Sequence, residues 1–231
     1  MASRRFVSRT AAGIALGREL ELRSFEHPIV VLGLARGGMP VAYEVARRLH
    51  APLDVMPVRK VGMPGQPELA IGAIAPGNIV VHEPHFPTSS PALADMFDEA
   101  ARSERSELTR RERVYRGGLG PLDLHSKTAI LVDDGLATGC TMLAAIRAAR
   151  HAGAAEVVAA APIASAEAEN LIASEADAVV ILDIPAALSS IGEWYQRFEQ
   201  LQDDEVCRLL ALDRESRRDH LSPASGRHET T

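Results

Sequence analysis

One continuous stretch, residues 128–150, restricts the fold of this chain more than any other part of the sequence. Residues 129–133 favour an extended strand, and from Met142 onwards apolar residues recur at helical spacing. Two adjacent carboxylates, Asp133 and Asp134, and a loop of small and polar residues lie between these segments. A strand that leads through a short loop into a helix is the repeating unit of α/β domains.

The loop and the two carboxylates have complementary chemistry. A loop of small residues at the start of a helix presents unpaired backbone N–H groups, and the helix dipole adds positive potential there. Such a loop suits a phosphate group. Carboxylates repel phosphate but accept hydrogen bonds from hydroxyl groups, so the stretch suits a ribose 5-phosphate. The plain alternative is an ordinary strand–turn–helix in which Asp133 and Asp134 only cap the turn.

The run LVDDGLATGCT, residues 131–141, resembles the phosphoribosyl diphosphate (PRPP) motif of the type I phosphoribosyltransferases, in a bacterial-type branch. The match covers the whole loop and is therefore more specific than a lone glycine-rich turn. The resemblance implies transfer of a 5-phosphoribosyl group from PRPP to an acceptor, with release of pyrophosphate. It implies that Asp133 and Asp134 are catalytic residues that accept hydrogen bonds from the ribose hydroxyls. The implied 5-phosphate ligands are Ala137, Thr138, Gly139, Cys140 and Thr141.

A second loop follows the apolar run 29–34, whose continuous hydrophobicity is typical of a strand buried on both faces. This loop contains Arg36, Gly37 and Gly38. The two glycines allow a ligand to approach the backbone closely, and the arginine offers a planar cation to phosphate oxygens. The loop resembles the pyrophosphate loop of the same family.

Arg59 and Lys60 end a second candidate strand, residues 53–58. Ligands bind at the carboxyl ends of strands in open α/β sheets, although a solvated strand end is the plain alternative. Residues 61–68 have the glycine and proline content of a mobile loop. In the family a flexible loop here closes over PRPP and excludes water, so we expect Arg59 to bind pyrophosphate and Lys60 to be catalytic.

A charge-rich helix is expected at about residues 91–117, as an insertion relative to compact family members. A solvated arm is the plain interpretation of this helix. A subunit contact, or a cover that carries arginines over the site, is the sharper hypothesis. The arginines available for anion contacts are Arg110, Arg111, Arg113 and Arg116.

The remaining apolar runs, residues 156–161 and 178–182, predict two further strands with helices between them. Right-handed crossovers then give an α/β fold with a mostly parallel twisted sheet flanked by helices. Residues 1–212 are expected to form a single domain with a small hood at about 184–212, and residues 213–231 a disordered tail. In the hood, Trp194 and Tyr195 are candidates for the acceptor side, unless the aromatic residues only anchor a terminal helix.

Overall composition excludes several classes of protein. A net charge of −6 argues against a nucleic-acid-binding protein. Two cysteines far apart in sequence indicate reduced thiols rather than a disulfide framework. The sequence has neither a secretory signal pattern nor a long apolar segment, so we expect no membrane association and a cytoplasmic location.

The family resemblance also implies a cofactor and partners. These are Mg²⁺, bound mainly through PRPP and near Asp133 and Asp134, PRPP itself, a small-molecule acceptor and a second copy of the chain in a homodimer. We expect the acceptor to be a nitrogenous base. Ala137 stands where relatives acting on 6-oxopurines carry an aspartate, which disfavours guanine or hypoxanthine salvage. The alternative function is a PRPP- or nucleotide-sensing regulator that keeps the fold without catalysis.

Overall fold

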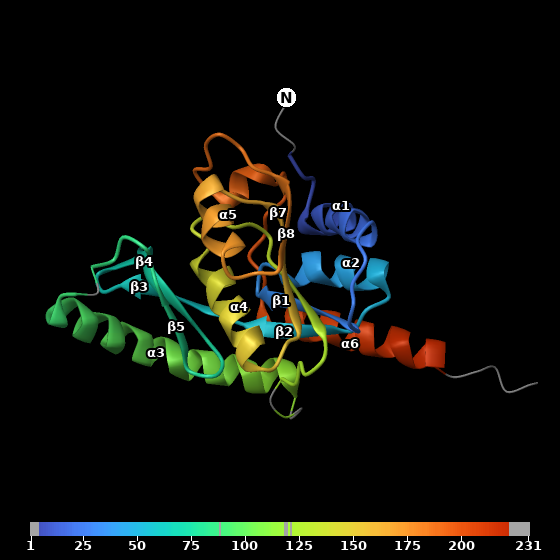
Figure 1. Cartoon of the computed structure of the whole chain (residues 1–231), viewed down its shortest axis with the longest axis horizontal. Helices are drawn as coiled ribbons and strands as arrows, with labels where there is room; N and C mark the ends of the chain where they lie inside the picture. The colour runs from blue at the N-terminus through green and yellow to red at the C-terminus, as the bar shows by residue number, and fades with distance from the viewer. Residues whose placement is uncertain (1–4, 88, 118–119, 121, 222–231) are drawn as a thin grey trace, which may run out of the picture.

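A five-stranded parallel sheet forms the centre of the protein (Figure 1). The computed structural model describes residues 5–87, 89–117, 120 and 122–221. The strand order is β2-β1-β6-β7-β8, and every neighbouring pair is parallel. The strands are β1 (Ile29–Ala35), β2 (Leu53–Pro57), β6 (Thr128–Val132), β7 (Glu156–Ile163) and β8 (Ala178–Asp183). The predicted α/β class with a mostly parallel sheet is confirmed.

Helices cover both faces of this sheet. One face packs against α1 (Arg9–Glu21), α2 (Met39–Leu49) and α6 (Asp203–Leu221), and the other against α4 (Cys140–His151) and α5 (Ala166–Ala173). Successive strand residues point to opposite faces, so Ile130 packs in the first of these cores and Leu131 in the second. Both residues are fully buried, as a continuous apolar run predicts.

The strand order places the two glycine-containing loops side by side. The chain adds β2 on one side of β1 and later places β6 on the other, so the order reverses at β1. Because β1 and β6 are parallel, with Gly33 opposite Val132, the loops after these strands leave the same edge of the sheet. Open α/β sheets bind ligands at such a switch point.

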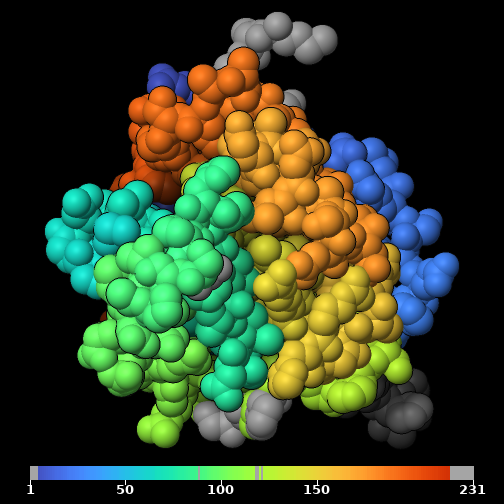
Figure 2. Space-filling view, turned by 60° about the vertical axis from the view of Figure 1, so that its left-hand side comes forward, coloured from blue at the N-terminus to red at the C-terminus, as the bar shows by residue number. Residues whose placement is uncertain are grey.

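A second unit, which we call the arm (residues 59–116), projects from the central sheet (Figure 1). In the space-filling view its green and teal surface lies beside the yellow and orange surface of the central unit (Figure 2). It contains the antiparallel strands β3 (Arg59–Met63), β4 (Gln66–Ala75) and β5 (Ile79–His82), and the 26-residue helix α3 (Pro91–Arg116). Pro76 and Gly77 lie in the turn between β4 and β5, where Ala75 pairs with Ile79. No described helix, α3 included, is both long and apolar enough to cross a membrane.

The expectation of a mobile loop at residues 61–68 was wrong for most of this segment. Residues 61–63 and 66–68 belong to β3 and β4, and the turn between them contains Gly65 with φ 81°. Val61 pairs with Gly72, and Met63 pairs with Gln66. Cross-strand pairing therefore overrides the low strand propensity of the glycines and prolines.

The arm has a hydrophobic core of its own. Phe97 on α3 is fully buried, and its ring lies 4.2 Å from the ring of His82 and 6.0 Å from the ring of Phe86. Val61 and Ile74 of the small sheet complete this cluster. The insertion helix is therefore packed along one side and is not a fully solvated arm.

The C-terminal helix is longer than expected. The sequence suggested a tail from residue 213, whereas α6 continues to Leu221, and residues 222–231 lie outside the described part. The buried carboxylate of Asp213 accepts hydrogen bonds from the Leu53 backbone N–H (3.2 Å) and from Arg217 Nε (2.9 Å). These bonds attach the helix to the edge strand β2.

We predict that Phe97→Ala destabilises the protein by about 3–5 kcal/mol, because the truncation leaves a cavity in the core of the arm. Val114→Ala is the matched control, since Val114 lies on the same helix but is 42% exposed. This control should change the free energy of unfolding by no more than about 0.5 kcal/mol. Denaturant unfolding of both variants measures the difference, and equal effects would show that the arm core contributes little to folding.

Candidate functional site

A cleft of about 430 Å³ opens at the switch point of the central sheet. Its charged lining consists of five cationic residues and one acidic residue. The cations are Arg9, Arg36, Arg59, Lys60 and Arg111, and the acidic residue is Glu199. Each of the four arginines is also paired with a carboxylate outside this lining, so a polyanionic ligand would compete with those acids for the guanidinium groups.

The two acids follow β6 directly and lie against the loop that follows β1. A Cβ atom added to Gly37 would lie 2.3 Å from Asp134 Oδ2, so only glycine allows this approach. Asp134 Oδ2 accepts a hydrogen bond from Arg9 Nε (2.7 Å), and its backbone oxygen accepts one from the Tyr195 hydroxyl (2.6 Å). Asp133 Oδ1 accepts from the backbone N–H of Asp134 (2.9 Å).

Burial makes this pair of acids hard to ionise together. Desolvation and the charge of Asp134 raise the pKa of Asp133 well above its usual range. Desolvation also raises the pKa of Asp134, while the guanidinium of Arg9 opposes that rise. The two carboxyl groups can therefore both be ionised in the folded protein only when a cation lies close to them.

The candidate phosphate loop, residues 137–141, ends at the start of α4. Gly139 precedes the helix with φ 82°, and no side chain caps the first turn. Thr138 is exposed, and Thr141 lines the cleft. The N–H groups at this end of α4 are therefore available to an anion.

Cys140 belongs to this loop but lacks the character of a nucleophile. Its thiol donates to Glu83 Oε2 (2.9 Å). Burial, followed by the contact with Glu83, raises the pKa of Cys140 to about 12. This side chain ties the loop to the end of β5 and remains protonated at neutral pH.

The candidate pyrophosphate loop is a tight turn. Gly38 N–H donates to the Leu34 oxygen (2.9 Å), and the peptide bond between Ala35 and Arg36 is cis. A Cβ on Gly38 would lie 2.4 Å from the Val132 oxygen, so this position also requires glycine. Arg36 lines the cleft and lies 3.7 Å from Asp203 of α6.

The arm supplies the remaining cations of the cleft. Arg59 Nε donates to Glu104 of α3 (2.6 Å), and the exposed Lys60 donates through Nζ to the Glu68 backbone oxygen (3.0 Å). Arg111 comes from α3 itself and is fixed by Glu107, with 2.7 Å between Nε and Oε1. Of the four α3 arginines considered from the sequence, only Arg111 lies among the described residues that line the cleft. The feature of the sequence that distinguishes Arg111 is its i, i+4 spacing from Glu107.

Trp194 and Tyr195 do not line the cleft. Their exposed fractions are 9% and 6%, and both pack in a small core with Phe6. Instead, Phe198 lines the cleft, is 39% exposed, and carries the Arg9 guanidinium 3.7 Å above its ring. The candidates for the acceptor side thus lie behind the cleft wall, because the chain is extended after the short helix η1 (Ile191–Trp194) instead of forming a longer helix.

We predict that Asp133→Asn stabilises the unliganded protein at pH 7, because burial and the charge of Asp134 raise the pKa of Asp133 and disfavour its charged form. A carboxyl whose pKa is higher in the folded than in the unfolded chain binds more protons when folded. The free energy of unfolding of the wild type therefore falls as pH rises from about 4, the ordinary pKa, through the raised value.

Urea unfolding of both proteins between pH 3.5 and pH 8 measures this difference. The gain from Asp133→Asn should vanish below about pH 4, where the wild-type carboxyl is protonated in both states. Glu19→Gln, at an exposed position of α1, is the control. A gain that does not depend on pH would contradict the electrostatic explanation.

Several known proteins are similar to this chain in sequence or in fold. Residues 9–200 match the family described as the phosphoribosyl transferase domain. Two Mycobacterium tuberculosis proteins, one of them Rv0571c, are 43% identical over 205 residues, and their names give phosphoribosyl transferase as an unproven activity. The alignment covers 89% of this chain, which spans about half (46%) of the length of these relatives. The crystal structure of TT1426 from Thermus thermophilus is similar, with a TM-score of 0.73, 38% identity, and coverage of 89% of this chain and 97% of that one. This chain belongs to the phosphoribosyl transferase domain family, and its parallel sheet has the fold of that family.

Proposed function

We propose that this protein transfers a 5-phosphoribosyl group from PRPP to a small-molecule acceptor and releases pyrophosphate. One observation carries the proposal: Asp134 lies against Gly37 at the edge of a cleft that is also lined by five cationic residues and by Thr141 in the uncapped first turn of α4. PRPP has the matching parts, which are a sugar diol, a 5-phosphate and a pyrophosphate.

The 5-phosphate would bind at the start of α4. The backbone N–H groups of residues 137–141 and the hydroxyls of Thr138 and Thr141 are the donors in this proposal. Gly139 allows the tight turn before the helix, because its φ is 82°. The protonated Cys140 thiol and Glu83 would hold the loop in place.

The ribose hydroxyls would bind at Asp133 and Asp134. In the unliganded structure Arg9 occupies Asp134 Oδ2, so the diol has to share or replace that contact. Displacement at the anomeric carbon builds positive charge on the ring, and two nearby carboxylates stabilise it. Ionisation of both buried carboxyl groups is unfavourable, and the positive charge of the transition state would offset that cost.

The pyrophosphate would bind among the cations at the other side of the cleft. Arg36, Gly37, Gly38 and Arg59 are the predicted ligands, and the structure adds Arg111 from the arm. Lys60 already lines the cleft from β3, next to Arg59. The open space around Gly65 would allow the tip of the β3–β4 hairpin to bend towards the ligand.

Mg²⁺ fits this site as a partner of the substrate. Among the described residues no group of three or more His, Cys, Asp or Glu side chains could hold a metal ion. Two carboxylate-bearing residues, Asp133 and Asp134, are available next to a phosphate site, and Mg²⁺ is commonly bound by one or two carboxylates, water and phosphate oxygens. Bound there, the ion would neutralise the leaving pyrophosphate.

We propose a nitrogenous base as the acceptor. Ala137 removes the acid–base group expected for 6-oxopurines, while the half-exposed ring of Phe198 offers an apolar face in the cleft. A PRPP-sensing regulator is the second candidate. It is favoured by the Arg9–Asp134 ion pair, which blocks the proposed diol site of the unliganded protein.

We predict that Asp134→Asn lowers turnover by about 10²–10³-fold, the effect of removing one preorganised electrostatic contact to a transition state. The assay measures pyrophosphate released from PRPP across a panel of bases, amines and phenols. Asp123→Asn is the control, because Asp123 is exposed and does not line the cleft. Equal turnover of the Asp134 variant and the wild type would refute the assigned role. Tight PRPP binding without turnover on any acceptor would favour the regulator.

We predict that Arg111→Gln weakens PRPP binding by about tenfold, since a buried charged hydrogen bond contributes about 1.5–3 kcal/mol. Arg113→Gln is the matched control, because Arg113 is exposed on the same helix and does not line the cleft. Calorimetric titration with PRPP and Mg²⁺ at two salt concentrations measures both the affinity and its electrostatic part. Identical affinities for the two variants would exclude the arm from the site.

A further inference from the structure

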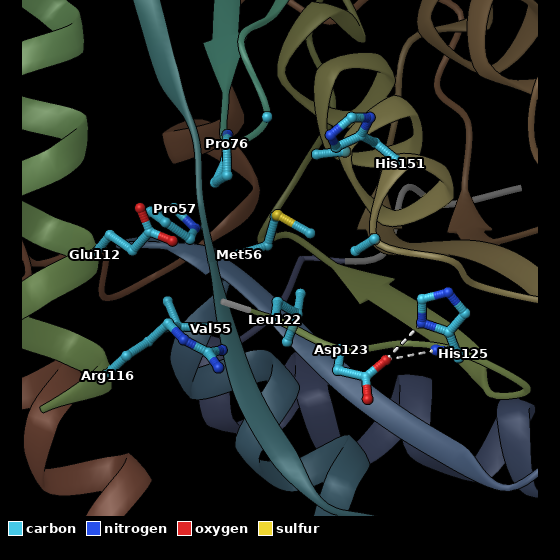
Figure 3. Close-up of a pocket in the computed structure, with 13 residues that line it drawn as sticks. Val55, Met56, Pro57, Pro76, Glu112, Arg116, Leu122, Asp123, His125 and His151 are labelled. Atoms are coloured by element: carbon cyan, nitrogen blue, oxygen red, sulfur yellow. Dashed lines mark hydrogen bonds and ion pairs between the residues drawn. The ribbon is translucent and has the colours of Figure 1, made fainter. Parts of the chain in front are cut away.

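A second hollow, of about 640 Å³, lies beside the cleft and shares none of its described lining residues. We call it the side pocket (Figure 3). Consecutive residues separate the two hollows: Val58 and Arg111 line the cleft, whereas Pro57 and Glu112 line the side pocket. The proposed transfer reaction uses no residue of the side pocket.

The side pocket has the size and the walls of a small-molecule site. Its volume falls within the range of about 300–1,000 Å³ that is typical of such sites. Met56, Leu122 and Ala148 give it apolar surfaces, and Pro57 of β2 and Pro76 of the arm also line it (Figure 3). An apolar ring would be desolvated by these walls.

Arg116 places an unused donor at the wall of the side pocket. Its side chain is only 8% exposed, Nη1 donates to Asp54 Oδ2 (2.6 Å), and Nη2 donates to the Gly120 oxygen (3.0 Å). Nε is buried and has no hydrogen-bond partner among the described residues. Buried donors without an acceptor are rare. Because Nε is shielded from solvent, the Arg116 side chain has to shift towards the pocket before a ligand can accept from it.

The charges around the pocket indicate which acceptor fits. Asp54 already neutralises Arg116, and the other charged residues of the lining are Glu112 and Asp123. Asp123 pairs with His125 (2.7 Å) at the exposed rim, as the dashed lines in Figure 3 show. A phosphate or carboxylate would meet net negative charge here. The fitting acceptor is therefore a neutral oxygen.

Glu112 supplies an acceptor on the same helix, one turn before Arg116. It lies four residues before Arg116, and residues at this spacing are neighbours on one helix face. Its carboxylate makes no hydrogen bond or ion pair with another described residue. One helix face therefore carries an acceptor and a donor one turn apart, and a ligand that bridges them needs both an N–H and a C=O.

We propose that the side pocket binds a neutral heterocycle with a lactam edge. The ring carbonyl accepts from Arg116 Nε, the adjacent ring N–H donates to Glu112, and the ring packs against Met56 and Leu122. The net negative charge of this pocket disfavours the phosphorylated substrate proposed for the cleft. The site is separate from the proposed transfer reaction, and its test does not require turnover.

Calorimetric titration of the full chain with hypoxanthine and with uracil tests the proposal. Purine is the matched control ligand, because it resembles hypoxanthine but lacks the lactam carbonyl. Hypoxanthine should bind at least about tenfold more tightly than purine, the effect expected when a ligand leaves a buried donor and acceptor unpaired. Equal binding of hypoxanthine and purine, or no binding of either lactam, would overturn the proposal.

Three variants locate the bound ligand. Arg116→Lys keeps the charge beside Asp54 but removes the Nε donor, and should weaken hypoxanthine binding by about tenfold. Ala152→Phe fills the pocket at a half-buried position and should abolish binding even if the Arg116 variant fails to fold. Phe198→Ala removes the aromatic ring of the cleft and should leave binding unchanged. Binding that survives Ala152→Phe but is lost in Phe198→Ala would place the ligand in the cleft and refute the side-pocket site.

Discussion

The close contact between the loops after β1 and β6 is the constraint on which the rest of the site depends. Parallel pairing of these strands brings the loops to the same edge, and glycine at positions 37 and 38 lets them touch. With any side chain at Gly37, the carboxylate of Asp134 would have to move away. The candidate sugar and pyrophosphate sites are therefore parts of one packed junction.

Burial of two adjacent carboxyl groups at this junction destabilises the folded protein. Two adjacent carboxyl groups lose solvent, which raises the pKa of both. Arg9 reaches across from the start of α1 to balance Asp134, and the Phe198 ring and the Glu199 backbone oxygen hold the guanidinium in place. Charge that is unfavourable in the free protein and useful when a cationic transition state forms is typical of functional sites.

The arm contributes more to the site than its charge-rich sequence suggests. Its helix α3 fixes Arg59 through Glu104 and delivers Arg111 to the cleft, while Glu112 and Arg116 line the side pocket. The arm also packs against the main sheet, since Ala73 and Val81 belong to the same core as α4. One helix therefore lines both the cleft and the side pocket.

The sequence alone determined the class of fold and the two glycine-containing loops. Apolar runs such as residues 29–34 report burial on both faces directly, and alternation of strands with helices permits little besides a parallel sheet. The local order of residues 131–141 was enough to indicate a phosphate loop, because strand, acids and helix start are all encoded within eleven neighbouring positions.

Only the tertiary structure decided which distant side chains meet in the cleft. Arg9 reaches Asp134 across 125 positions of sequence, and no periodicity predicts such a contact. The same holds for the hood, whose aromatic residues could have anchored a terminal helix. Instead, Tyr195 forms a β-bridge with Phe6, Trp194 is buried and Phe198 lines the cleft. The strands at residues 61–68 and the helix beyond residue 212 likewise depend on pairing and on the buried Asp213, which are long-range interactions that override local propensity.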